Sequence, residues 1–318
     1  MELVENDSAG RCGNLARTLL VLDNFEWIKH EAESIGVTVI PIKGIDVLTS
    51  FYSERLDRDV RDIDLLTSSV DDCLKLVGRL CDNGYVPEFD FAVRSDALLA
   101  KKKISLLSTS PCRVNVDIHF ALVTKKFFSP TTSTFNADAF ARQKSGRLDS
   151  VDNWLFLAQH GCFHLFSDSK WIRDLDIVYQ SFTDDERRTL SQRVEQYGFK
   201  RVWLATLSFL KQVLRLVGDV GSDDTSFVEF VKHLSAVRKK SPAKKTALSF
   251  LEFFFIADRR QRSRSWLKLI FPRRGMLANI YRINHKALYP LFWVAHVTLM
   301  AVTVPLAHTV YRFHKYLL

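Results

Sequence analysis

Residues 61–66 read Arg-Asp-Ile-Asp-Leu-Leu, and residues 39–44 before them read Val-Ile-Pro-Ile-Lys-Gly. In a β-strand the side chains at i and i+2 lie on the same face. Asp62 and Asp64 are therefore expected side by side, while the apolar residues between and after them anchor the other face. Two adjacent carboxylates repel one another unless a cation lies between them. The stretch predicts a strand with a cation site on its polar face.

The Asp-x-Asp pattern occurs three times, at 57–59, 62–64 and 174–176, but only the second lies in an apolar β-run. A second strand pattern at 114–120, Val-Asn-Val-Asp-Ile-His-Phe, offers Asp117 as a third carboxylate. Three carboxylates on a strand surface can hold two hard divalent cations through oxygen ligands. Paired cations of this kind recur in phosphoryl and nucleotidyl transfer. We therefore expect Mg²⁺, or Mn²⁺, as the cofactor.

Lys43 and Gly44 lie between an apolar strand and a predicted helix. A glycine at such a turn lets backbone N–H groups approach an anion, and the following helix N-terminus favours negative charge. Lys43 would add a point charge for a triphosphate and Arg58 a bidentate donor. The alternative is a simple strand–helix turn with basic residues at the surface.

The pattern of strands and helices changes along the chain. Up to residue 120 it mixes helices with strands, and after about residue 148 only helical spacing remains. The expected strands lie at 37–42, 63–66 and 114–120, and the expected helices at 14–34, 70–83, 151–166, 169–182, 184–198, 200–217, 224–237 and 243–258. This predicts an α+β protein with a mixed-sheet core at 1–147 and a helical domain at 148–318.

Positive charge is concentrated in the predicted helical domain. Residues 232–282 hold 14 Lys or Arg and two acids, so this basic segment can meet phosphates, a membrane surface or nucleic acid, or form solvated helix faces. Residues 287–311 carry no charged side chain. Such a helix can span a bilayer, lie against it beside the basic segment, or pack in its own domain. The five cysteines form no Cys-x-x-Cys pair and no signal-peptide pattern is present, which predicts a cytoplasmic location with membrane association open.

Several polar residues are candidates for supporting roles. His160 and His164 have the i, i+4 spacing of two metal ligands, but Gly161 follows the first histidine, which excludes the zinc-protease motif. His119 faces the same way as Asp117 and is expected to hydrogen-bond a ligating carboxylate. Lys170 and Asp174, also at i, i+4, either pair with each other or help to close the site from the helical domain.

Taken together, these motifs resemble the uncharacterised nucleotidyltransferase family of bacteria, within the DNA polymerase β-like nucleotidyltransferase superfamily. The family pattern has an apolar strand ending in Lys-Gly, a tyrosine, an arginine, Asp-Ile-Asp-Leu-Leu, an Asp-x-His strand, a helix with two histidines, Trp-x-x-Asp-Leu and a late Phe-Pro with basic residues. The matching positions are 42–44, Tyr52, Arg58, 62–66, 117–119, His160, His164, 171–175 and 271–274. The likeness covers roughly residues 14–290 and is strongest over 37–66 and 114–120.

The resemblance implies a minimal nucleotidyltransferase core. Asp62, Asp64 and Asp117 would be its metal-binding and catalytic triad, and Lys43 with Gly44 would contact the phosphates of a nucleoside triphosphate. It implies transfer of a nucleoside monophosphate to an acceptor, and a sugar, a small molecule, a protein and an RNA all remain open. The alternatives are a catalytically inactive nucleotide-binding regulatory module, or a membrane-peripheral or nucleic-acid-binding protein that uses the basic segment.

Overall fold

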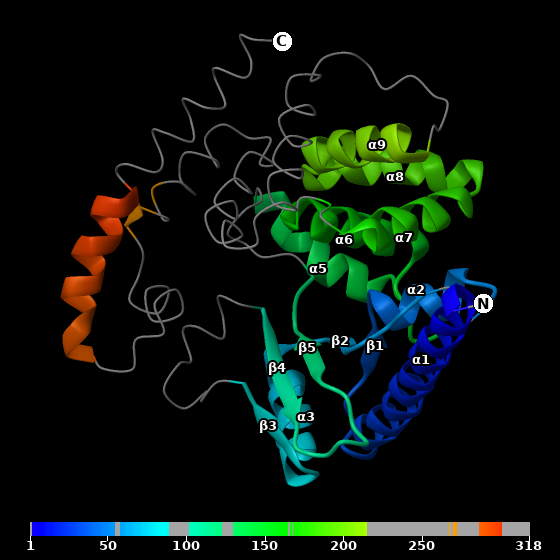
Figure 1. Ribbon diagram of the computed structural model, residues 1–318. Coiled ribbons are helices and arrows are strands. Elements are labelled where there is room, and N and C mark those ends of the chain that lie inside the picture. The colour runs from blue at the N-terminus through cyan, green and yellow to red at the C-terminus, as the bar shows by residue number, and fades with distance from the viewer. Residues whose placement is uncertain are drawn as a thin grey trace. The chain divides into compact units, whose positions relative to one another are not determined.

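The computed structural model describes residues 2–54, 58–88, 102–122, 130–164, 166, 168–214, 267, 270–271 and 286–300. Contacts divide the chain into two compact units. The first unit comprises Met1–Leu122 and Asn136–Asn153, and the second comprises Val123–Phe135 and Trp154–Leu318. A mixed sheet is followed by a helical region (Figure 1), which confirms the predicted α+β class. The domain boundary predicted at residues 147/148 stays a prediction.

The first unit is built on a five-stranded sheet in the order β1-β2-β5-β4-β3. Its strands are β1 (Val39–Pro41), β2 (Ile63–Thr67), β3 (Tyr85–Pro87), β4 (Lys103–Ser108) and β5 (Val116–His119). β2 and β5 run parallel, and the other neighbours are antiparallel. The register sets Asp64 opposite Asp117 across the parallel pair, and Ser105 opposite Asp117 on the other side of β5.

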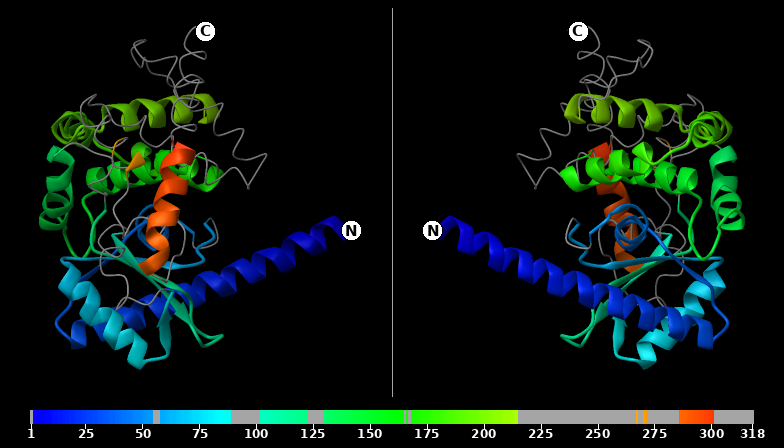
Figure 2. Two further views of the ribbon diagram at one scale, coloured as in Figure 1. Left: turned by 90° about the vertical axis from the view of Figure 1, so that its left-hand side faces the viewer. Right: turned by 90° about the vertical axis from the view of Figure 1, so that its right-hand side faces the viewer.

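Three helices belong to this sheet: α1 (Glu2–Ser34), α2 (Gly44–Phe51) and α3 (Val70–Asp82). The Ser69 hydroxyl caps α3 by accepting a hydrogen bond from the Asp72 amide at 3.1 Å, and Gly84 follows the helix end with φ 87°. Serine at an N-cap and glycine just past a helix end are the residue types that these two positions favour. α1 begins earlier than the predicted residue 14, and Figure 2 shows it as one continuous helix with its C-terminal half against the strands.

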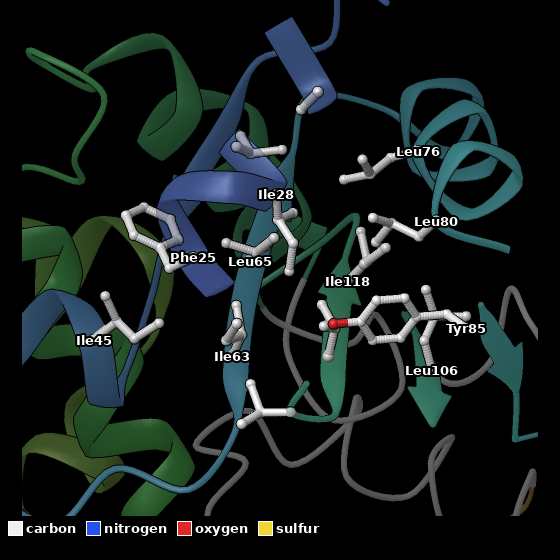
Figure 3. Packing of buried hydrophobic residues seen from close by; sticks show 14 of the residues in the cluster. Phe25, Ile28, Ile45, Ile63, Leu65, Leu76, Leu80, Tyr85, Leu106 and Ile118 are labelled. Atoms are coloured by element: carbon white, nitrogen blue, oxygen red, sulfur yellow. The ribbon is translucent and has the colours of Figure 1, made fainter. Parts of the chain in front are cut away.

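The core lies between one face of the sheet and helices α1 and α3. Figure 3 shows α1 and α3 side chains packed on apolar side chains of the strands, among them Ile63, Leu65 and Ile118, all of which are fully buried. Burying an aliphatic side chain of this size contributes about 1.5–3 kcal/mol. Because strand side chains alternate, anchoring this face turns Asp64 and Asp117 to the opposite face.

The remaining helices are α5 (Pro130–Ala141), α6 (Ser150–Phe163), α7 (Ser169–Gln180), α8 (Asp184–Tyr197) and α9 (Lys200–Leu214). Within the second unit, the Trp154 indole donates to the Leu175 carbonyl at 3.1 Å, and Phe135 meets the rings of Tyr197 and Phe199 edge-on. These contacts join α6 to α7, and they pack the end of α8 and the residue before α9 against the Phe135 ring.

The end of the chain is described over residues 286–300. A short 3₁₀ helix, η4 (Lys286–Leu288), leads into a helix over 289–300. The helices predicted at 224–237 and 243–258, and nearly all of the basic segment, lie outside the described residues. Among the helices that the structure describes, none combines the length and apolar character that crossing a membrane requires.

Candidate active site

Two carboxylates and an imidazole converge on the polar face of the sheet. Asp64 lies on β2, and Asp117 and His119 lie two residues apart on the parallel strand β5. One potential ligand atom from each residue lies within 4.8 Å of the others, the one such group of three found in the described part of the chain. Asp64 and His119 are buried, and Asp117 is partly exposed. The group therefore offers oxygen and nitrogen donors to a divalent cation from one side.

Lys43 reaches this group from the residue before α2. Its ammonium nitrogen lies 2.6 Å from Oδ1 of Asp64 and 3.4 Å from Nε2 of His119, and Nε2 lies 3.0 Å from the same Oδ1. Burial by itself would raise the pKa of Asp64, but the charge of Lys43 and the hydrogen bond with His119 outweigh it. The pKa of this carboxyl therefore lies well below its usual range, and Asp64 is ionised.

The same surroundings also lower the pKa of His119. Burial and the positive charge of Lys43 lower the pKa of His119, and the hydrogen bond and charge of Asp64 only partly oppose them. The ring is consequently neutral near pH 7. A neutral imidazole has a lone pair for a metal ion, so His119 has the protonation state of a ligand.

Asp117 has partners of its own on β4. The ammonium of Lys103 forms a short ion pair with Oδ2, and the Ser105 hydroxyl donates to Oδ1 at 2.6 Å. The sequence reasoning missed both residues. The alternation of polar and apolar residues from Lys103 to Leu106 is a strand signal, but the pattern by itself does not tell which strand would lie beside it.

The turn at Lys43 and Gly44 has an unusual backbone. Lys43 has φ 55° and ψ −120°, a region that a side chain makes unfavourable. A Cβ atom on Gly44 would lie 3.0 Å from both the Arg58 guanidinium and the Val60 side chain. Glycine therefore permits the buried Arg58 side chain to pack against the turn. The predicted phosphate-binding residues Lys43, Gly44 and Arg58 are brought together.

Asp62, which was expected beside Asp64 on the strand, lies just outside it. It precedes β2 by one residue and is exposed, whereas Asp64 is buried within the strand. The converging group contains Asp64, Asp117 and His119 without Asp62. His119, expected as support for a ligating carboxylate, is itself a member. A ligand role for Asp62 stays a prediction.

The other predicted candidates lie in the second unit. The rings of His160 and His164 have centroids 4.5 Å apart, and both lie close to the Trp171 ring, at 5.5 and 4.6 Å. The Lys170 ammonium lies 3.5 Å from the Asp168 carboxylate, and Asp174 is buried. The two histidines thus form an aromatic cluster with Trp171 of α7 at the end of α6, and a supporting role for them at the site stays a prediction.

Comparison with known proteins identifies one family. A family model described as an uncharacterised nucleotidyltransferase matches residues 8–215, about two thirds of the chain. The match includes every strand of the sheet and every residue of the converging group. No curated protein matches the chain.

Proposed function

The chain belongs to the uncharacterised nucleotidyltransferase family, and on that premise we propose that it moves a nucleoside monophosphate from a nucleoside triphosphate to an acceptor hydroxyl, releasing pyrophosphate. The observation that carries the proposal is the convergence of Asp64, Asp117 and His119 on one face of the sheet. Nucleotidyl transfer needs such a group because the triphosphate is strongly negative and its reacting oxygens need a cation.

The donor chemistry of this group fits Mg²⁺ or Mn²⁺. Asp64 and Asp117 would hold the ion through carboxylate oxygens, with His119 beside them and Asp62 as a further oxygen donor at the start of the strand. When bound, the ion would stabilise the charge that develops on the phosphate and leaving-group oxygens.

The remaining residues act on the phosphates and on the acceptor. Lys43 carries a cation on a flexible stem, and Arg58 lies against Gly44 at the start of α2, so both are suited to bind and orient phosphate oxygens. Asp117 is the more accessible of the two carboxylates, with 18% of its side chain exposed against 6% for Asp64. It is therefore the better candidate to receive the proton of the acceptor hydroxyl.

The test is transfer of label from each of the four α-³²P nucleoside triphosphates, with pyrophosphate release measured in parallel. Sugars, small molecules, proteins and RNA serve in turn as acceptor. Asp64→Asn and Asp117→Asn should each abolish transfer. Asp72→Asn, which removes a carboxylate from α3, is the control and should leave it intact. Full activity in either site variant would refute the mechanism.

Binding without turnover would point to a different function for the same site. If calorimetry shows that the wild-type protein binds a metal–triphosphate complex, yet no acceptor class yields pyrophosphate, the regulatory nucleotide-binding module replaces the enzyme. The same two asparagine variants would then lose binding in place of activity.

Contact with a membrane surface is a second candidate function, and one observation favours it. Apolar side chains on the helix over 289–300 are exposed, with Leu291 at 67%, Val294 at 58% and Leu299 at 53%. The neighbouring sequence is the basic segment 232–282, which suits anionic lipid. Flotation with phosphatidylserine vesicles should recover the protein at low salt, and Leu291→Asp should reduce the recovery. Equal flotation with neutral vesicles would contradict the role of charge.

A further inference from the structure

Each carboxylate of the converging group already forms an ion pair with a lysine. Lys43 pairs with Asp64, and Lys103 pairs with Asp117. The two negative charges are thus matched by two positive charges within the same site. A divalent cation that approached these oxygens alone would meet a site with no net negative charge from these four side chains.

The position of the Lys43 ammonium adds a steric argument. Its nitrogen lies 2.6 Å from Asp64 Oδ1 and 3.4 Å from His119 Nε2, so it contacts polar atoms of two of the three residues that could ligate a metal. A magnesium ion needs ligand distances of about 2.1 Å. The ammonium and the ion cannot both occupy the space in front of the same oxygen, so one must displace the other.

Lysine is well suited to being displaced. Its charge is a point on a flexible four-carbon stem, and it can move to a new oxygen anion without the fixed geometry that arginine requires. A triphosphate supplies such oxygens beside the turn at Gly44, where the proposed phosphate contacts lie. The two lysines cancel the attraction of the carboxylates for a cation, and the negative charge of the triphosphate restores it.

We propose that Lys43 and Lys103 are internal competitors of the divalent cation, so that the site takes up its metal together with the triphosphate and only weakly before it. This inference rests on the proposed function and specifies its substrate as the metal–triphosphate complex. Lys103 is the clearer probe of the two because the Asp117 side chain that it would leave unpaired is 18% exposed, against 6% for Asp64, so its removal leaves no fully buried unpaired charge.

The experiment measures Mn²⁺ binding to the full chain by the electron paramagnetic resonance signal of the free ion. Lys103→Met and Lys43→Met should each tighten binding of Mn²⁺ alone by about tenfold, since each leaves a carboxylate without its cation. Lys75→Met is the matched control: it removes a lysine from an ion pair with Asp72 on α3 and should leave Mn²⁺ binding unchanged. The second arm adds α,β-methylene triphosphates of the four nucleosides in turn, and wild-type binding of Mn²⁺ should then tighten by at least about tenfold.

The two arms separate this inference from the proposed function. If neither site variant binds Mn²⁺ more tightly than wild type, or if wild type binds an analogue without any gain in its affinity for Mn²⁺, the lysines do not compete and the inference is overturned. If wild type binds no analogue at any Mn²⁺ concentration, the proposed function fails, whereas tighter Mn²⁺ binding by the variants would still establish the competition. A gain of similar size in Lys75→Met would also refute it, because the effect would then be one of overall charge.

Discussion

Asp46 provides a quantitative test of the electrostatics next to the candidate site. It lies in the first turn of α2, is 2% exposed, and accepts hydrogen bonds from Asn153 at 2.7 Å and Ser50 at 3.3 Å. Burial raises the pKa of Asp46 from its ordinary 3.8 to about 6, although the charge of Arg147 and the bond from Ser50 oppose the rise. The folded protein therefore binds this proton more tightly than the unfolded chain does.

The sign of the pH dependence follows from that difference. The raised pKa contributes stability that is fully present below pH 3.8 and is lost as the pH rises through about 6. At about 1.4 kcal/mol per pKa unit, the full contribution is about 3 kcal/mol. Because the unfolded carboxyl is already partly ionised at pH 4, about 2 kcal/mol of it is lost between pH 4 and pH 7. Asp46→Asn keeps the shape and the bond from Asn153 but cannot ionise, so it should escape this loss.

The assay is urea denaturation of the wild type and Asp46→Asn at unit steps from pH 4 to pH 7. The difference in unfolding free energy between them should shift by about 2 kcal/mol in favour of the variant as the pH rises from 4 to 7. Arg147→Gln should lose more stability than the wild type over this pH range, because it removes the charge that lowers the pKa of Asp46. A difference that stays constant across this range would show that folding does not raise the pKa of Asp46.

Two further substitutions test particular local contacts. Gly44→Ala places a Cβ 3.0 Å from the Arg58 guanidinium and the Val60 side chain, so it should displace Arg58. Triphosphate binding measured by calorimetry should then weaken about tenfold. An unchanged affinity would mean that Arg58 is not one of the proposed phosphate contacts. Thr183→Ala removes the capping box at the start of α8, in which Thr183 and Glu186 bond each other's backbone N–H, and should lower stability by about 1 kcal/mol in urea denaturation. A loss of stability below about 0.3 kcal/mol would mean that water bonds the backbone N–H groups as well as the capping side chains do.

The local features of the sheet could be predicted from the sequence because their signals are local. Alternation over 62–66 and 114–120 identified the strands that carry Asp64 and Asp117, and helical spacing identified a helix over 70–83, close to the bounds of α3. The common face of Asp117 and His119 followed from their i, i+2 spacing. These features depend on a few consecutive residues, so one sequence is enough to read them.

Features that depend on which distant strands pair with each other could not be predicted from the sequence. Lys103 and Ser105 reach Asp117 only because β4 lies antiparallel to β5, and no feature of residues 103–108 indicates that partner. Asp62 was grouped with Asp64 on spacing alone, but the strand begins at Ile63 and leaves Asp62 exposed. The ion pair between Lys43 and Asp64 likewise depends on β1 and β2 being neighbours.

The proposed function requires Asp64 and Asp117 to hold a divalent cation together with a nucleoside triphosphate. The most direct measurement is anomalous diffraction from crystals grown with Mn²⁺ and an α,β-methylene nucleoside triphosphate. We expect a manganese peak about 2.1 Å from carboxylate oxygens of both Asp64 and Asp117, with the Lys43 ammonium moved from Asp64 to a phosphate oxygen. A triphosphate bound elsewhere, with Lys43 and Lys103 still paired to these carboxylates and no manganese between them, would contradict it.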